Sequence, residues 1–319
     1  MTVISAIRFN NNSGAISSDE QGSYHIRKTD IVSKLTTVPV NIPLIIGGSG
    51  ASNVLYEIKK RVIKSAANTE FPKKDPNEIL RAVSQIINNT REDFVNSILN
   101  ASYHIDLIDF QRGYRVLKNG TSIQLNSEVM KDAHNIVSGR GQTQQLLSNS
   151  FLCLMKESEK PEIYVLDMSC NKPYVSARPY EVIGSGADMA DIVLSDFFRV
   201  YKDDERDNVN ENDGMAALLY STWKASVVNI GVGGAPQLKY IKGNKIIKPS
   251  EDCRRLATEI VVSERAGYID RSLRKTALEE LVFKEGGNDS TVEDELWNHV
   301  SDKRLCSRHL RGYRNNKIE

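Results

Sequence analysis

The chain opens with the stretch TVISAIRF at residues 2–9, which is rich in apolar and β-branched residues and predicts a β-strand. The next five residues, NNNSG at 10–14, are typical of a hairpin turn. The residues AISS at 15–18 then predict the returning strand. We therefore expect a sheet that begins with a hairpin, with Thr2 as the first residue of its first strand.

Thr2 gives this strand a chemical interest. If Met1 is removed, Thr2 carries a hydroxyl nucleophile and a free α-amine in one residue. Such an amine has a reference pKa of about 7.7–8.0, so it can accept the hydroxyl proton near neutral pH without a histidine. No leader is expected before Thr2, and methionine aminopeptidase alone would expose it because threonine is small.

Two further strands are predicted at 31–38 and 42–46, the second followed by the glycine turn GGSG at 47–50. After that turn the apolar residues repeat with a helical period up to about Ile63. A second helix begins at DPNE, residues 75–78, which combines an N-cap acid with proline at the first helical position, and extends to about Leu99. The glycines are thus expected between a strand and a helix.

The second half repeats this order. Strands are expected at 150–155, at 162–167 and in a short segment ending at Ile183, followed by the turn GSG at 184–186. Two helices are expected at 187–201 and 213–227, then a last strand at 236–241. Between the halves, residues 101–148 are interpreted as an insertion, with two strands within 103–117 and a helix at 128–137.

This order predicts an α+β protein in which two antiparallel sheets stack face to face with helices on both outer faces, a four-layer αββα sandwich. We expect one domain at 2–248, with the insertion at about 101–148, and a helical C-terminal extension at 249–319.

Composition excludes several classes of protein. With 40% hydrophobic and 26% charged residues the chain is a globular protein, and its 42 basic against 41 acidic residues favour neither a nucleic-acid nor a membrane partner. No apolar run approaches the ~18 residues of a membrane helix, and no signal peptide is apparent, so a cytoplasmic location is expected. The four cysteines and five histidines lack zinc-site spacing, so we expect no metal and no cofactor.

Five motifs in this order resemble the proteasome family of N-terminal nucleophile (Ntn) hydrolases, which includes proteasome β subunits and HslV. They are TVIS at 2–5, SDEQGS at 18–23, VSKL at 32–35, GGSGAS at 47–52 and VIGSG at 182–186. The resemblance covers about residues 2–94 and 150–242. It implies the Ntn-hydrolase fold and a site around Thr2.

The resemblance implies a role for each matched residue. Lys34 would lower the pKa of the Thr2 hydroxyl, and Asp19 would keep Lys34 charged and oriented. A backbone N–H of Gly47 or Gly48 would form the oxyanion hole. Ser185 would orient the α-amine. Read without the family, Asp19 and Lys34 could be an ordinary interstrand ion pair, the glycines a tight connection and Ser185 a helix cap.

One part of the pattern departs from the family. Proteasome β subunits usually carry an aspartate and, three residues later, a serine before paired glycines. This chain has Asn229 and Val232 before Gly233-Gly234. Asn229 can support Ser185 and the amine by hydrogen bonding but brings no charge.

The function predicted is that of a threonine-type peptidase or amidohydrolase that forms an acyl-enzyme on Thr2. The resemblance further implies a polypeptide substrate, self-association into a ring or related homo-oligomer, and an unfolding ATPase as partner. Two alternatives stay open: a transpeptidase that passes the acyl group to an amine, and a non-catalytic assembly subunit.

Overall fold

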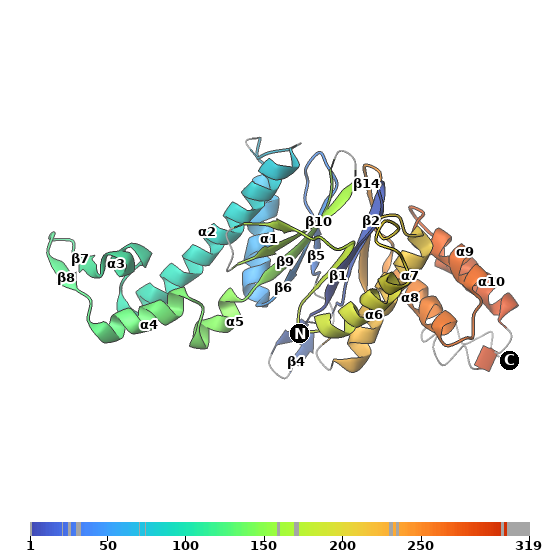
Figure 1. Cartoon of the computed structure of the whole chain (residues 1–319). Helices are drawn as coiled ribbons and strands as arrows, with labels where there is room; N and C mark the ends of the chain where they lie inside the picture. The colour runs from blue at the N-terminus through green and yellow to red at the C-terminus, as the bar shows by residue number, and fades with distance from the viewer. Residues whose placement is uncertain are drawn as a thin grey trace. The chain divides into compact units, whose positions relative to one another are not determined.

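The computed structural model describes residues 2–20, 22–24, 27–29, 33–69, 71–73, 75–157, 160–168, 172–229, 232–233, 236–300 and 303–304. The chain divides into two compact units (Figure 1). Unit 1 comprises residues 1–49, 151–165 and 174–319, and unit 2 comprises residues 50–150 and 166–173. Within the described ranges, no helix combines the length and the apolar character needed to cross a bilayer.

The first sheet of unit 1 is built around the expected N-terminal hairpin. Its strand order is β12-β1-β2-β13-β14, and neighbouring strands are antiparallel. The bounds are β1 (Ile4–Asn10), β2 (Ser13–Ser18), β12 (Tyr180–Ile183), β13 (Gln237–Lys242) and β14 (Lys245–Ile247). Ile7 lies opposite Ala15 across the hairpin, so the strands predicted at 2–9 and 15–18 are confirmed.

The second sheet has the order β11-β10-β9-β6-β5. Its strands are β5 (Leu35–Thr37), β6 (Leu44–Ser49), β9 (Ser150–Lys156), β10 (Pro161–Asp167) and β11 (Tyr174–Val175). The glycine turn predicted at 47–50 is wrong in its first residues, because Gly47 and Gly48 are the last part of strand β6. Gly47 pairs with Leu35, and a Cβ at Gly47 would lie 2.9 Å from side-chain atoms of Ile4 and Leu35. Close packing therefore explains this glycine.

The two sheets face each other across an apolar core. Residues from both sheets line it: Ile4, Ala6, Ile16, Leu35, Ile45, Leu152, Leu154, Ile163, Val165 and Ile241. Because side chains alternate along a strand, Ile7 and Phe9 point to the opposite face of the first sheet, where they join a second and larger core. That core is formed with the helices of unit 1.

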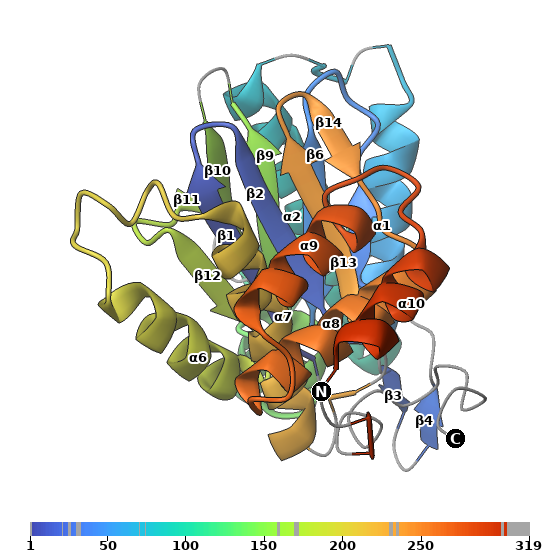
Figure 2. The same ribbon diagram turned by 90° about the vertical axis from the view of Figure 1, so that its right-hand side faces the viewer.

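The helices of unit 1 cover this opposite face of the first sheet. They are α6 (Ala187–Arg199), α7 (Glu211–Val228), α8 (Glu251–Arg265), α9 (Arg271–Leu281) and α10 (Asp289–His299). Figure 2 shows α7 and α8 against strands β1, β2 and β13, with α9 lying further out. Unit 1 thus has two antiparallel sheets and one helical layer, and the fourth layer of the expected sandwich stays a prediction.

Two small sheets complete the strands. The first consists of β3 (Gly22–Tyr24) and β4 (Arg27–Thr29), which come after β2 in the chain. The second, β7 (Tyr114–Val116) with β8 (Ser122–Gln124), belongs to unit 2.

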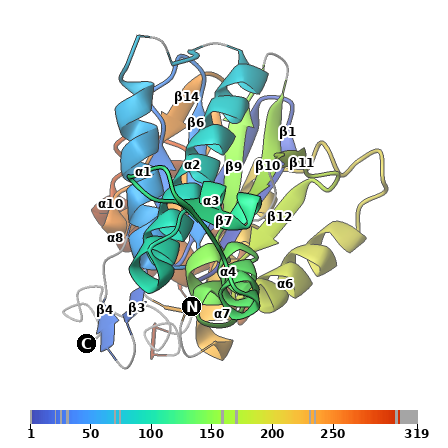
Figure 3. The same ribbon diagram turned by 90° about the vertical axis from the view of Figure 1, so that its left-hand side faces the viewer.

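The helices of unit 2 are α1 (Ser52–Ala66), α2 (Pro76–Tyr103), α3 (Leu107–Arg112), α4 (Ser127–Val137) and α5 (Gln144–Leu147), with a 3-10 turn at Gly141–Thr143. Figure 3 shows α1 beside α2. The N-cap predicted for α2 is confirmed, since the Asp75 side chain accepts from Asn77 N and Glu78 N. Of the two strands expected within 103–117, one is present as β7 and the other is wrong, because α2 continues to Tyr103 and a new helix, α3, begins after its N-cap Asp106.

Candidate functional site

Thr2 lies two residues before strand β1, and its backbone is hydrogen-bonded to the turn GSG at 184–186, which precedes α6. Its backbone N–H donates to Ser185 Oγ at 3.1 Å, and its carbonyl accepts from Gly186 N at 3.0 Å. Thr2 is 8% exposed. Thr2 and Ser185 are 183 positions apart in the sequence, and the pairing of β12 with β1 brings them together.

The first glycine of this turn is required by its closeness to Thr2. Gly184 has a φ of +102°, and a Cβ there would lie 2.2 Å from the Thr2 carbonyl oxygen. Ser185 is not the helix cap that its position suggested. The N-cap of α6 is Gly186, which makes no side-chain cap bond, and the Ser185 hydroxyl instead accepts from Thr2. The turn is thus shaped around Thr2, two residues before β1 begins.

Asp19 and Lys34 form a buried ion pair on the other side of the Thr2–Val3 peptide. Lys34 Nζ lies 2.7 Å from Asp19 Oδ1, and the same oxygen accepts from Val3 N at 2.9 Å. The second oxygen of Asp19 faces Gly233 N at 3.4 Å. The side chains of Asp19 and Lys34 are only 1% and 6% exposed. Because Val3 N and the lysine ammonium share one oxygen, Lys34 lies beside the residue that follows Thr2.

Burial dominates the electrostatics of this pair. Loss of water raises the pKa of the Asp19 carboxyl above its usual value, although the charge of Lys34 opposes the change. Loss of water likewise lowers the pKa of the Lys34 ammonium, opposed by Asp19 and then by Glu20. Apart from the Asp19 contact, Lys34 Nζ has no hydrogen-bond partner in the described part of the chain. The ammonium therefore retains N–H donors for another group.

Gly47 and Gly48 differ in what can reach them. Gly47 is buried between Ile4 and Leu35, whereas Gly48 is partly exposed. The Gly48 N–H makes only a long contact, 3.4 Å, with the Lys34 carbonyl. Gly48 is thus beside Lys34, and it is the more exposed of the two glycines.

Asn229 and Val232, the departures from the family pattern, lie at the end of α7. The Asn229 side chain donates to the Ala225 carbonyl at 3.2 Å, so it completes the helix end. Val232 packs with Val3 and Ala225 and approaches Gly186. The chain therefore has an apolar contact of Val232 with Val3, the residue after Thr2, at the position where the family usually has a serine. Gly234 lies outside the described residues.

Sequence reasoning missed three residues around this site: Gln237, Glu20 and Arg254. The Gln237 side-chain oxygen accepts from Lys34 N at 3.0 Å and from Leu35 N at 3.2 Å. Glu20, next to Asp19, pairs with Arg254 of α8 at 2.9 Å. Arg254 falls within the apolar face of α8, and a charged residue at such a position is the one hint the sequence offers.

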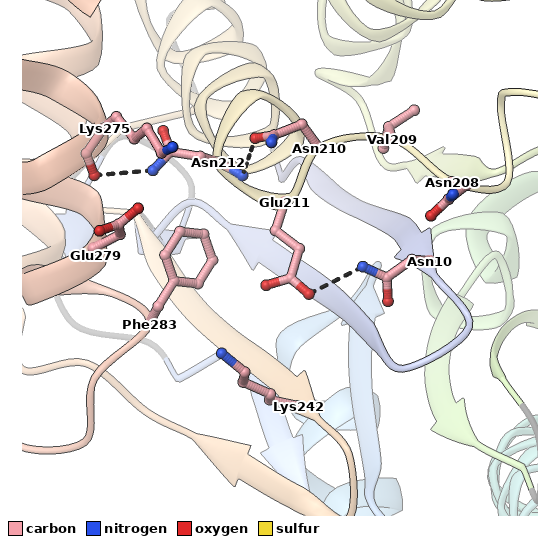
Figure 4. Close-up of a pocket in the computed structure, with 10 residues that line it drawn as sticks. All are labelled: Asn10, Asn208, Val209, Asn210, Glu211, Asn212, Lys242, Lys275, Glu279 and Phe283. Carbon is pink, nitrogen blue, oxygen red and sulfur yellow. Dashed lines mark hydrogen bonds between the residues drawn. The ribbon is translucent and has the colours of Figure 1, made fainter. Parts of the chain in front are cut away.

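A pocket of about 620 Å³ lies at the opposite end of β1 (Figure 4). It is lined by Asn10, Asn208, Val209, Asn210, Glu211, Asn212, Lys242, Lys275, Glu279 and Phe283. Glu211 accepts from Ser13 Oγ and Tyr240 Oη, both at 2.6 Å, and from Asn10 Nδ2 at 3.0 Å. Both oxygens of the Glu211 carboxylate thus already accept hydrogen bonds from the protein. Among the described residues, no three His, Cys, Asp or Glu side chains gather as a metal site.

Comparison with known proteins finds no matching family model and no matching curated sequence. Solved structures do match. An Anbu (Gly-1) mutant from Hyphomicrobium sp. strain MC1 has a TM-score of 0.51 at 11% identity and covers 78% of this chain and 86% of its own. The Anbu (ancestral beta-subunit) from Yersinia bercovieri has a TM-score of 0.51 at 11% identity, covering 75% and 81%. Anbu from Hyphomicrobium sp. strain MC1 has a TM-score of 0.51 at 10% identity, covering 84% and 98%.

The chain has the fold of Anbu. This finding corrects the family that the sequence motifs suggested, since the three structures just described are Anbu proteins and not the proteasome β subunits or HslV that were named. Short motifs around Thr2 are shared among related folds and cannot separate such groups. At about a tenth of residues identical, the likeness to Anbu is one of fold alone.

Proposed function

We propose that this chain is an N-terminal threonine hydrolase that cleaves peptide or amide bonds after removal of Met1. One observation carries the proposal: a buried lysine with unfilled donors is paired with Asp19 beside the Thr2–Val3 peptide, while Ser185 binds the Thr2 nitrogen. A buried ion pair is costly to maintain, and perturbed pKa values such as those of Asp19 and Lys34 cluster at functional sites.

In the proposed reaction Thr2 Oγ attacks the substrate carbonyl carbon and its proton passes to the freed Thr2 amine. The Lys34 ammonium stabilises the developing negative charge on Oγ. The C–N bond of the substrate then breaks, and the amine returns the proton to the leaving nitrogen. Water attacks the resulting ester and releases the acid, which regenerates Thr2.

The substrate carbonyl oxygen also needs a donor while it carries negative charge. Of the two glycines expected to supply it, Gly48 is favoured because it is partly exposed and its N–H makes only the long contact to Lys34 O. Gly47 is enclosed by Ile4 and Leu35.

The proposal extends to a polypeptide substrate and to self-association. The second part is supported by the description of one neighbouring structure as an ancestral β-subunit. Light scattering coupled to size-exclusion chromatography tests it, and a single species of 35.7 kDa at micromolar concentration would contradict it.

Intact mass spectrometry tests the catalytic proposal. We expect the purified protein to lack Met1 and to gain one adduct with a β-lactone directed at N-terminal threonine, and we expect no adduct with Thr2→Ala. Retained Met1 with no adduct would instead identify a non-catalytic assembly subunit. A labelled acceptor peptide distinguishes hydrolysis from transpeptidation, since only the latter joins the label to product.

A further inference from the structure

Arg254 joins three separate chain segments by hydrogen bonds. Its Nε donates to the Pro236 carbonyl at 2.9 Å, its Nη1 to the Pro249 carbonyl at 3.0 Å and its Nη2 to Glu20 Oε1 at 2.9 Å. The residue is 8% exposed. A planar guanidinium holds such partners in one fixed arrangement, which the point charge of lysine does not.

Two of these contacts lead directly to the Asp19–Lys34 pair. Glu20 follows Asp19 in the chain, and its own N–H donates to the Gly233 carbonyl at 3.1 Å. Pro236 precedes Gln237, whose side-chain oxygen accepts from Lys34 N and Leu35 N. One side chain therefore restrains the segment that carries the carboxylate and the residue that holds the lysine backbone.

We propose that Arg254 is a positioning residue for the Asp19–Lys34 pair, supplied to the Thr2 site by the C-terminal helix α8. The proposal rests on the proposed function for its effect on catalysis, but the geometry of the pair can be measured independently. It assigns a role to the region beyond residue 249, for which the sequence predicted only a helical extension.

The charges around the site also connect Arg254 to Lys34, through Glu20. Asp19 and Glu20 both act on Lys34 and raise its pKa against the effect of burial. Glu20 in turn faces Arg254, Glu251 and Arg255; burial raises its pKa, and the two arginines oppose this rise. Loss of the Arg254 contacts thus changes both the position and the charge of a carboxylate close to Lys34.

A purely structural role for Arg254 is the alternative, and Arg274 of α9 provides a matched control. Arg274 is also buried, at 3% exposure, and donates to the Asn212 carbonyl at 3.0 Å and to Asp213 Oδ1 at 2.7 Å. Asn212 lines the pocket at the far end of β1. Arg254→Lys and Arg274→Lys therefore remove similar sets of hydrogen bonds from a buried arginine. Only those of Arg254 reach the segments next to Asp19 and Lys34.

The first measurement is the rate of β-lactone labelling at Thr2, corrected for the folded fraction. An error of about 1 Å in a catalytic group costs on the order of 10²-fold in rate, so we expect a loss of that size in Arg254→Lys. Arg274→Lys is expected to label at the wild-type rate. Equal rates in wild type and Arg254→Lys, or an equal loss in both variants, would overturn the proposal.

The second measurement does not depend on catalysis. Trace acetylation of Lys34 with acetic anhydride, followed against pH by peptide mass spectrometry, reports its accessibility at the high-pH plateau and its pKa at the midpoint. In Arg254→Lys we expect the plateau to rise and the midpoint to move up towards the usual value for lysine, by up to about one unit, which is a tenfold change in ionisation. Arg274→Lys should match wild type.

The two measurements separate the two proposals. A wild-type protein without an adduct would contradict the hydrolase, while a changed Lys34 profile in Arg254→Lys alone would still support the positioning role. An unchanged Lys34 profile in that variant, with normal labelling, would remove Arg254 and leave the hydrolase standing.

Discussion

Two carboxylates in unit 1, near opposite ends of strand β1, have pKa values that are shifted in opposite directions. Asp19, near the Thr2 end, is almost fully buried, and its pKa is raised because loss of water outweighs the charge of Lys34. Glu211, at the Asn10 end, is partly buried. Burial raises its pKa too, but hydrogen bonds from Ser13, Tyr240 and Asn10 outweigh this effect and leave the pKa lowered.

The difference separates a structural carboxylate from a candidate catalytic one. Glu211 is stabilised as an anion by neutral donors and by nearby Lys242, an arrangement that favours folding. Asp19 depends on a lysine that is itself destabilised by burial, an arrangement that costs folding free energy and keeps a charged donor available. The pocket beside Glu211 is thus the weaker candidate for a catalytic site.

The largest expected effect is on Lys34. Lys34→Ala is expected to slow β-lactone labelling of Thr2 by at least about 10³-fold, within the range for losing a group that assists proton transfer and charge stabilisation. Lys242→Ala, a lysine at the Glu211 end, is the control and should label normally. Undiminished labelling of Lys34→Ala, with the fold intact by circular dichroism, would remove Lys34 from the mechanism.

The second effect concerns stability at the same pair. Lys34→Met leaves Asp19 buried without its partner and should lower the free energy of unfolding by about 3 kcal/mol. Adding Asp19→Asn removes the isolated charge, so the double variant should recover most of that loss. Urea denaturation at pH 7 measures both. A double variant less stable than Lys34→Met would show that the Asp19 carboxylate stabilises the fold without Lys34, through its bonds from Val3 N and Gly233 N.

Glu211 should behave in the opposite manner. Because its folded pKa is lowered, its stabilising contribution is present above the unfolded value of about 4.3 and is lost as pH falls through the folded pKa. Glu211→Gln should therefore cost about 2 kcal/mol at pH 7, the scale of hydrogen bonds to a charged group. The difference from wild type should shrink below about pH 4. A pH-independent difference would assign the loss to packing.

The smallest effect is expected at Ser185. Its side chain is exposed, so Ser185→Ala should change stability by no more than about 0.5 kcal/mol. Labelling should nevertheless fall by about fivefold, because the Thr2 nitrogen loses an acceptor worth about 1 kcal/mol. Ser195→Ala, an exposed serine of α6, is the control. Equal labelling of all three proteins would leave Ser185 with no role in orienting Thr2.

Much of the fold was predictable because its signals are local. Asp75 and Pro76 begin a helix through their own side chains, and the NNNSG turn connects two strands within nine residues of each other. The prediction failed where a distant contact decides. Gly47 and Gly48 extend strand β6, in which Gly47 pairs with Leu35 of β5, and residues 103–112 form the end of α2 and helix α3 instead of a strand.

The site divides along the same line. By itself the sequence determined which residues are candidates for chemistry, since Thr2, Asp19, Lys34 and Ser185 are visible as residue types next to strand ends and glycine turns. Only the tertiary structure decided that Ser185 meets the Thr2 nitrogen, that Gln237 and Arg254 support the pair, and that Asp19 differs from Glu211. The physical reason is that these contacts join segments far apart in the sequence: Thr2 and Ser185 are 183 positions apart, and Lys34 and Gln237 are 203. Burial and hydrogen bonding between such segments set the charge and the position of each group.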